Sequence, residues 1–217
     1  MKECQGKLDG ILSDSSKFEH LTRNLTEDIK RDANWVFSTI NAATNTVHLP
    51  PILADFSLGY LYGNVKTHKE GNPLHQIISQ IPAPTYALAK HLNQIPSRYS
   101  LSTLLGFLKE ICNSTCTGIM VSLDVESTFT NMPVDETIDI ILNCIYLLPS
   151  TAPLNIPEAS LHTLMDICTK EPPSTPIKDR CSVRRDGFAL GSPLGVLFAN
   201  FYMGMVEERD LLRASAG

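Results

Sequence analysis

The sequence predicts an α+β fold, in which short strands and longer amphipathic helices follow one another along the chain. Strand character is seen in the apolar runs "YLYGNV", "HQIIS" and "TGIMVSLDV", and the turn sequence "KEGNP" separates the first two. Apolar residues at helical spacing follow Pro133, Pro157 and Pro193. Helical spacing also extends over residues 16–44, so we expect residues 1–50 to form an N-terminal helical segment.

Capping residues and prolines place the ends of these elements. Ser16 and Glu19 have the spacing of a capping box, which predicts that the first helix begins there. Ser192 is a good N-cap and Pro193 a good first residue for the last helix. A short helix is expected after "IPAPT", and the segment "EPPSTPIKDR" is predicted to be a loop because prolines and polar residues dominate it.

Composition narrows the class of protein. The 217 residues are 43% hydrophobic, which is enough for a packed core and excludes a disordered chain. The six cysteines show no zinc-binding spacing, so we expect reduced thiols in an intracellular protein. The first ten residues lack an apolar signal stretch, and no apolar run has the length of a membrane span, so no membrane partner is expected.

Charge is unevenly distributed along the chain. The net charge of −5 argues against a protein covered with nucleic-acid-binding surface. Between Tyr60 and Arg98, however, four residues are lysine or arginine and only Glu70 is acidic. A basic surface is therefore expected in this part of the chain.

One stretch, "VSLDVESTFTNMP", contains candidate residues for a functional site. It places the carboxylate of Asp124 at the end of a predicted core strand, where it would either bind a cation or cap the following turn. Phe129 follows five residues later and would either line a ligand site or fill the core. The residues by themselves leave both pairs of alternatives open.

Three strings in the chain together resemble one family. They are "YGNVKTHKEGNPLHQIIS" with "PTYALAK", "SLDVESTFTNMPVDETI" and "DGFALGSPLGVLFANFYM", and they resemble the reverse transcriptases of Penelope-like retroelements. The resemblance covers about Leu61 to Glu208. It implies a right-hand polymerase fragment: a partial reverse transcriptase domain over residues 51–217, with fingers at about 51–117 and an incomplete palm at about 118–212.

The resemblance implies nucleotidyl transfer assisted by a pair of metal ions. Such a reaction depends on positioning and on stabilising charge, and Mg²⁺ prefers hard carboxylate and carbonyl oxygens. Asp124 would be the catalytic residue and, with the carbonyl of Val125, a ligand of Mg²⁺, for which Mn²⁺ could substitute. The implied partners are an RNA template, a DNA primer and deoxynucleotides. By family expectation the protein acts in the nucleus, although no localisation signal is seen.

The same resemblance assigns the remaining site residues. Lys66 and His75 would bind the triphosphate of the nucleotide, and Phe129 would exclude a 2′-hydroxyl as a steric gate. Gly191 would let the backbone approach the nucleotide. The residues that would position template and primer are Asp186, Gly187, Ser192 and Pro193.

The sequence also departs from the family. His75 stands where the family has an arginine, and histidine cannot form the same bidentate contact with phosphate. The family's paired aspartates, which supply further metal ligands, have no counterpart in these residues. We therefore expect a truncated polymerase that is inactive as this chain alone, with an exposed palm edge through which it self-associates.

Two other interpretations remain open. One is a non-catalytic, retroelement-derived remnant or nucleic-acid-binding module. The other is an unrelated α/β interaction domain, which would require the matching strings to be coincidence.

Overall fold

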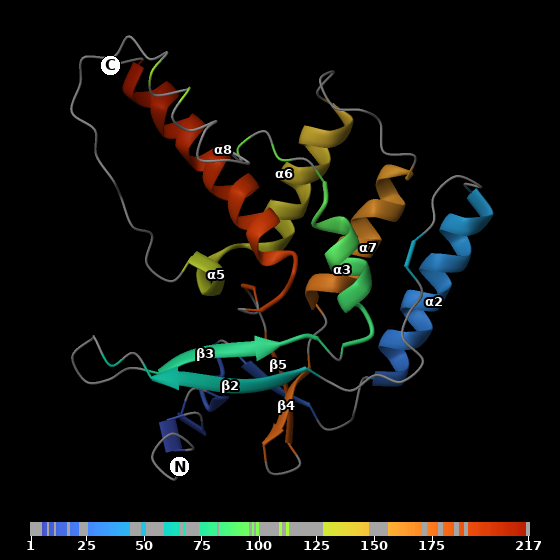
Figure 1. The fold of residues 1–217 in the computed structure, drawn as a ribbon, viewed down its shortest axis with the longest axis vertical. Coiled ribbons are helices and arrows are strands. Elements are labelled where there is room, and N and C mark those ends of the chain that lie inside the picture. Colours follow the sequence, from blue (N-terminus) through green and yellow to red (C-terminus); the bar gives the residue numbers. More distant parts are fainter. Residues whose placement is uncertain are drawn as a thin grey trace.

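The computed structural model describes nearly two thirds of the chain. The described residues are 6–7, 9–10, 12–16, 18–21, 26–43, 49–50, 59–65, 67, 74–81, 83–95, 97, 99, 109, 112, 128–147, 156–170, 173–177, 180–184, 187–188 and 191–215. Within them the fold is α+β, which confirms the predicted class (Figure 1). The helices are α2 (Thr26–Ala43), α3 (Tyr86–Leu92), α5 (Thr128–Asn131), α6 (Val134–Tyr146), α7 (Glu158–Lys170) and α8 (Gly195–Ser215).

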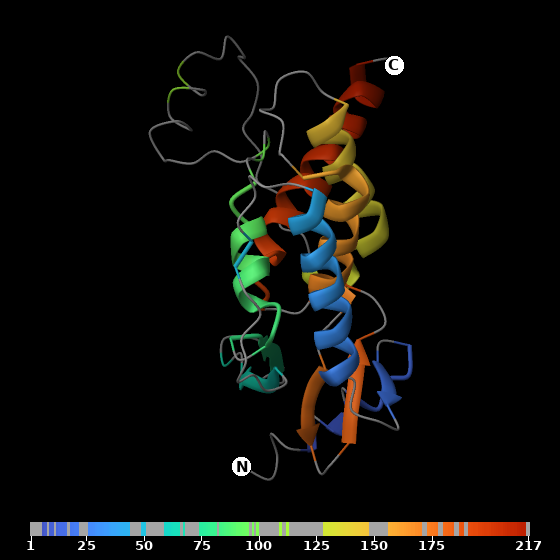
Figure 2. The same ribbon diagram turned by 90° about the vertical axis from the view of Figure 1, so that its right-hand side faces the viewer.

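Two small antiparallel sheets lie at one end of the molecule. Strand β2 (Tyr60–Val65) pairs with β3 (Leu74–Ser79) in a register that runs from Tyr60 opposite Ser79 to Val65 opposite Leu74. The other sheet has the order β1 (Phe18–Leu21), β5 (Arg180–Arg184) and β4 (Pro173–Ile177). The helices rise from these sheets, and the C-terminal end of α8 lies at the far end (Figures 1 and 2).

Several elements agree with the sequence-based expectation. The predicted strands "YLYGNV" and "HQIIS" are β2 and β3, and the short helix after "IPAPT" is α3. Helix α6 begins directly after Pro133, whose carbonyl accepts the Thr137 N–H at 3.1 Å. Helix α7 begins after Pro157, whose carbonyl accepts the Leu161 N–H at 2.9 Å. The predicted strand over 117–125 lies outside the described residues.

The first predicted helix is wrong in its N-terminal part. Phe18–Leu21 is a strand that pairs with β5, and the helix begins only at Thr26. Ser16 does not form the predicted capping box, because its N–H and hydroxyl both donate to the carboxylate of Asp14, at 3.0 and 2.5 Å. Glu19 instead lies opposite Val183 in the sheet. Burial of Phe18 and pairing with a distant strand outweigh the local helical spacing.

The predicted loop "EPPSTPIKDR" is also wrong, because its residues contribute to a hairpin. Pro173–Ile177 is strand β4, and Arg180 begins β5. Proline lacks the N–H that a central strand requires, but β4 lies at the edge of its sheet. An edge strand can therefore contain the prolines that made this segment look like a loop.

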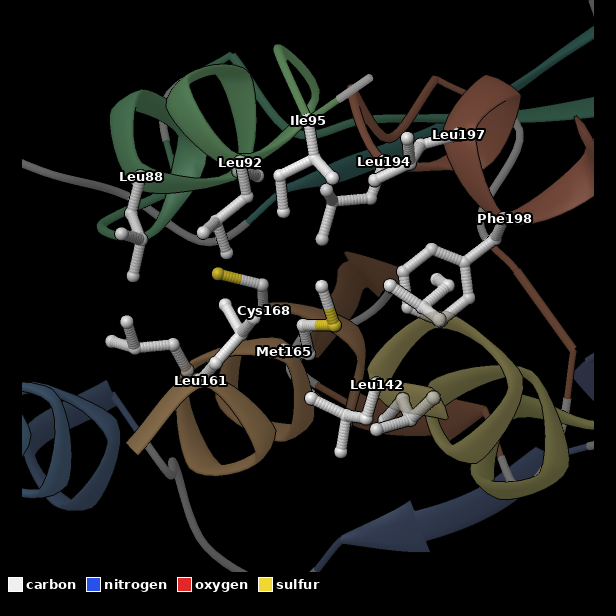
Figure 3. Packing of buried hydrophobic residues seen from close by; sticks show 14 of the residues in the cluster. Leu88, Leu92, Ile95, Leu142, Leu161, Met165, Cys168, Leu194, Leu197 and Phe198 are labelled. Carbon is white, nitrogen blue, oxygen red and sulfur yellow. The ribbon is translucent and has the colours of Figure 1, made fainter. Parts of the chain in front are cut away.

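The hydrophobic core lies among α3, α6, α7 and α8. Figure 3 shows side chains from these four helices meeting at one centre. The labelled residues are Leu88, Leu92, Ile95, Leu142, Leu161, Met165, Cys168, Leu194, Leu197 and Phe198, all of them buried. Each fully buried leucine of this kind stabilises the fold by about 1.5–3 kcal/mol, so these helices hold the molecule together.

Tyr99, in the segment that follows α3, packs against α8. Its ring lies against the α-carbon of Gly204, so closely that a β-carbon there would collide with the ring. The Tyr99 hydroxyl donates to the Glu208 carboxylate at 3.0 Å, and the ring meets Phe201 edge-on with centroids 6.0 Å apart. Glycine at position 204 is therefore required by this contact, although it is a poor helix former.

Two further sequence-based expectations can be compared with the described residues. Among the described cysteines, Cys112, Cys144 and Cys168 are not joined in a disulfide bond. Among the helices that the structure describes, none combines the length and apolar character needed to cross a bilayer.

The strand that replaces the predicted helix should be part of the cooperative fold. Phe18 is only 1% exposed, whereas its neighbour Glu19 is exposed. Replacing Phe18 by alanine should lower the free energy of unfolding by about 3–5 kcal/mol. The matched control Glu19→Ala should change it by less than about 0.5 kcal/mol. Urea unfolding of both variants would test this, and equal effects would contradict the strand.

Candidate functional site

The candidate site lies where α5 is in contact with the third string of the family resemblance, "DGFALGSPLGVLFANFYM". Gly187 has a φ of 79°, a left-handed conformation that glycine adopts without strain. The chain then turns so that the N–H of the buried Phe188 donates to the carbonyl oxygen of Phe129 at 2.5 Å. This hydrogen bond joins the "DGFALGSPLG" string to the helix that contains the predicted gate residue.

The ring of Phe129 lies against the beginning of α8. A β-carbon built on Gly195 would be 3.1 Å from Cε1 and 3.4 Å from Cδ1 of the Phe129 ring. Phe129 is half-buried and packs against the hydrophobic core. Both the backbone and the side chain of Phe129 are thus in contact with the third string.

Gly191 brings the same string against the two-stranded sheet. Its φ is 118°, and its α-carbon approaches the carbonyl of Ile78 in β3 so closely that a β-carbon would collide with the oxygen. The Ile77 side chain lies nearby, 3.7 Å from the same hypothetical atom. Only glycine accommodates both the backbone angle and the contact.

Ser192 accepts hydrogen bonds just before α8, but it is not the N-cap that the sequence predicts, because the carbonyl of Leu194 accepts the first helical hydrogen bond, from Phe198. The Ser192 hydroxyl accepts the N–H of Leu194 at 3.3 Å, and the Ser192 carbonyl accepts the N–H of Gly195 at 3.1 Å. Pro193 and Leu194 form a turn, so α8 begins at Gly195 rather than at Pro193. Helix ends are commonly shifted by a residue or two when the first turn is tight.

The three strings that share the family resemblance therefore meet in space. The first contributes β3, the second contributes Phe129, and the third contributes residues 187–188 and 191–195. Ile78, Phe129 and Gly195 belong to regions that are far apart in the sequence, yet each touches the third string or is part of it. Their convergence creates one junction between a sheet, a short helix and a long helix.

Other predicted site residues cannot be placed at this junction. Asp124, Val125, Lys66 and Asp186 lie outside the described residues. His75 belongs to β3, where it lies opposite Asn64. In the part of the chain that is described, no group of three or more histidine, cysteine, aspartate or glutamate residues could hold a metal ion. The Mg²⁺ site therefore stays a prediction.

Sequence reasoning missed an exposed aromatic pair on β2. Tyr60 is 49% exposed and Tyr62 is 39% exposed, and their ring centroids are 5.8 Å apart with the planes tilted by 32°. Residues two apart in a strand point to the same face. The alternation of tyrosines in "YLYGNV" is the signal that could have identified this pair.

Gly191 should be intolerant of substitution. Gly191→Ala should lower the free energy of unfolding by roughly 2–4 kcal/mol, because the new β-carbon adds backbone strain and a clash with Ile78. Gly10→Ala is the matched control, since no atom lies within 4 Å of a β-carbon there. Thermal unfolding of the two variants measures the difference. A Gly191→Ala protein as stable as the control would rule out the contact with β3.

Comparison with known proteins gives no relative for this chain: no protein-family model, no curated protein and no solved structure matches it.

Proposed function

We propose that this chain is a fingers and palm portion of an RNA-directed DNA polymerase that resembles the reverse transcriptases of Penelope-like retroelements. The observation that supports this most is the convergence of β3, Phe129 and residues 187–188 and 191–195. If the three strings matched the family by coincidence, nothing would require them to meet. A polymerase needs them together, because fingers and palm enclose one incoming nucleotide.

In this proposal each described residue has a positional role. Phe129, half-buried beside α8, places a ring next to the sugar of the incoming nucleotide. Gly187 and Gly191 supply the left-handed turns that bring the third string against α5 and β3. Ser192 accepts hydrogen bonds just before α8, so that the string keeps one orientation relative to the core.

The proposal also includes residues outside the described part of the chain. Asp124 and the carbonyl of Val125 would hold Mg²⁺, and Lys66 would bind the triphosphate. His75, which belongs to β3, would contact the triphosphate together with Lys66. When bound, Mg²⁺ stabilises the negative charge that develops as the phosphoryl group is transferred. The described residues would orient the nucleotide between β3, Phe129 and the N-terminus of α8.

The tyrosine pair on β2 supports a nucleic-acid partner. Exposed aromatic rings on a sheet face can stack with unpaired bases, and the interaction tolerates any base. Lys90 and His91 are exposed in the last turn of α3, which follows β3 in the chain. Single-stranded nucleic acid is bound by aromatic rings that stack on bases together with positive side chains that contact phosphates, and in this proposal Lys90 supplies such a charge. In the proposed polymerase this strand would be the template.

A second candidate function shares this surface. The chain has no adjacent pair of aspartates, and one aspartate cannot assemble a two-metal site. A non-catalytic nucleic-acid-binding module would keep the tyrosines and the basic residues without catalysis. The two candidates differ in whether the junction binds a nucleotide and whether a primer is extended.

Binding of an RNA template–DNA primer duplex is the first test. We expect the purified chain to bind the duplex at low salt, with an affinity that falls steeply as salt is raised, because phosphate contacts release counterions. Fluorescence anisotropy of a labelled duplex measures this, and absence of binding at low salt would remove the support for either candidate. A companion primer-extension assay with Mg²⁺ or Mn²⁺ should show no product. Template-dependent extension that Asp124→Asn abolishes would prove catalysis and contradict the expected inactivity.

The tyrosine pair can be tested separately with a single-stranded RNA oligonucleotide. Tyr60→Ala combined with Tyr62→Ala should weaken binding by roughly tenfold or more, because stacking on an aromatic ring contributes about 1–3 kcal/mol per base. Trp35→Ala is the control, since Trp35 is an aromatic residue on α2 that is 64% exposed. If all three aromatic residues mattered equally, or none did, the sheet face would not be the binding surface.

A further inference from the structure

Gly195 is the first residue of α8, and its backbone is not in the left-handed conformation that favours glycine. The feature that favours glycine there is the ring of Phe129, 3.1 Å from where a β-carbon would be. Very few contacts of a β-carbon are this short, and any larger residue at 195 would push the ring by a few tenths of an ångström.

The ring cannot absorb such a push by moving the whole of α5. The carbonyl of Phe129 accepts the hydrogen bond from Phe188, and the ring of Phe188 packs on Phe198 with centroids 4.4 Å apart. Phe188 and Phe198 are both at most 2% exposed, so this anchor lies in the core. The backbone at Phe129 is thereby fixed, and a substitution at Gly195 is transmitted to the ring.

We propose that Gly195 is a positioning residue that sets where the Phe129 ring lies, and thereby how strongly the site prefers a deoxyribonucleotide over a ribonucleotide. This inference rests on the proposed function, because it assigns the ring to the sugar of the nucleotide. The only atoms within 4 Å of a β-carbon built on Gly195 would be those of the Phe129 ring. A ribonucleotide has one more heavy atom than a deoxyribonucleotide, the 2′-oxygen, which would contact the Phe129 ring. Repulsion at van der Waals contact rises steeply as the distance falls, so moving the ring by a few tenths of an ångström decides whether the 2′-hydroxyl fits.

The experiment is a double-mutant cycle on nucleotide binding. The full chain is saturated with an RNA template–DNA primer duplex whose primer ends in a dideoxynucleotide and whose next template base is uracil, in the presence of Mg²⁺. Equilibrium dialysis then gives the dissociation constants of dATP and ATP, and their ratio is the selectivity. Because the primer cannot be extended, the measurement requires no catalysis.

We expect the wild-type chain to prefer dATP by roughly tenfold or more, as expected for a pocket that discriminates by one small group. Phe129→Ala should remove the preference. Gly195→Ala should change it by about threefold or more in the wild-type background, and by nothing in the Phe129→Ala background, since the ring transmits the effect. Phe129→Leu replaces the alanine variant if that variant does not fold.

A matched control separates positioning from general damage to α8. Val196 is the next residue of the helix and is 59% exposed, so Val196→Ala alters the same turn away from the ring. It should leave the selectivity unchanged. Unfolding midpoints of all variants show whether a change in selectivity merely follows stability.

The possible failures are distinguishable. If Gly195→Ala keeps the wild-type selectivity, or changes it equally without the Phe129 ring, the positioning role is wrong and the proposed function stands. If the duplex binds but the wild-type chain shows no preference between the nucleotides, or binds neither of them, the gate assignment and this inference both fail. If neither the duplex nor a nucleotide binds, the proposed function fails as well.

Discussion

The hydrogen bond from the Phe188 N–H to the Phe129 carbonyl is the interaction on which the junction depends. Gly187, the residue before Phe188, adopts a left-handed φ of 79°, which glycine tolerates without strain. The side chain of Phe188 lies in the core and packs on Phe198. One turn therefore anchors the third string in the core and fixes the position of the second.

Glycine at close contacts lets α8 serve as the centre of the molecule. Just before the helix Gly191 approaches β3, at its first residue Gly195 approaches Phe129, and further along Gly204 holds the ring of Tyr99. Each contact would be blocked by a β-carbon or would require its neighbour to move. The helix and the turn before it can thus contact a sheet, a short helix and an extended segment. Of the three glycines only Gly204 lies inside the helix, where glycine is less favourable than alanine by about 1 kcal/mol.

Short sequence patterns predicted the helices and the hairpin whose ends and faces are determined by residues close together in the chain. Helices α6 and α7 follow prolines and have a clear apolar face, and the hairpin of β2 and β3 has a recognisable turn sequence. The β4–β5 hairpin was missed because the prolines of β4 are typical of a loop. Strand β1 was missed because it depends on pairing with β5, which is distant in the chain. For the same reason motifs identified Gly191 and Phe129 as candidates, but no sequence pattern could show that Gly195 touches the Phe129 ring.

The two roles considered for Phe129, core residue and ligand contact, are compatible in this geometry. A fully exposed ring would have no fixed orientation, and a fully buried ring could not meet a ligand. Phe129 is half-buried, with its backbone anchored by Phe188 and its ring against Gly195. Because the orientation of the Phe129 ring is already fixed, the ring loses little conformational entropy when a ligand binds, and the site is preorganised. Packing of the ring into the core is therefore a condition of the proposed nucleotide-binding role rather than an alternative to it.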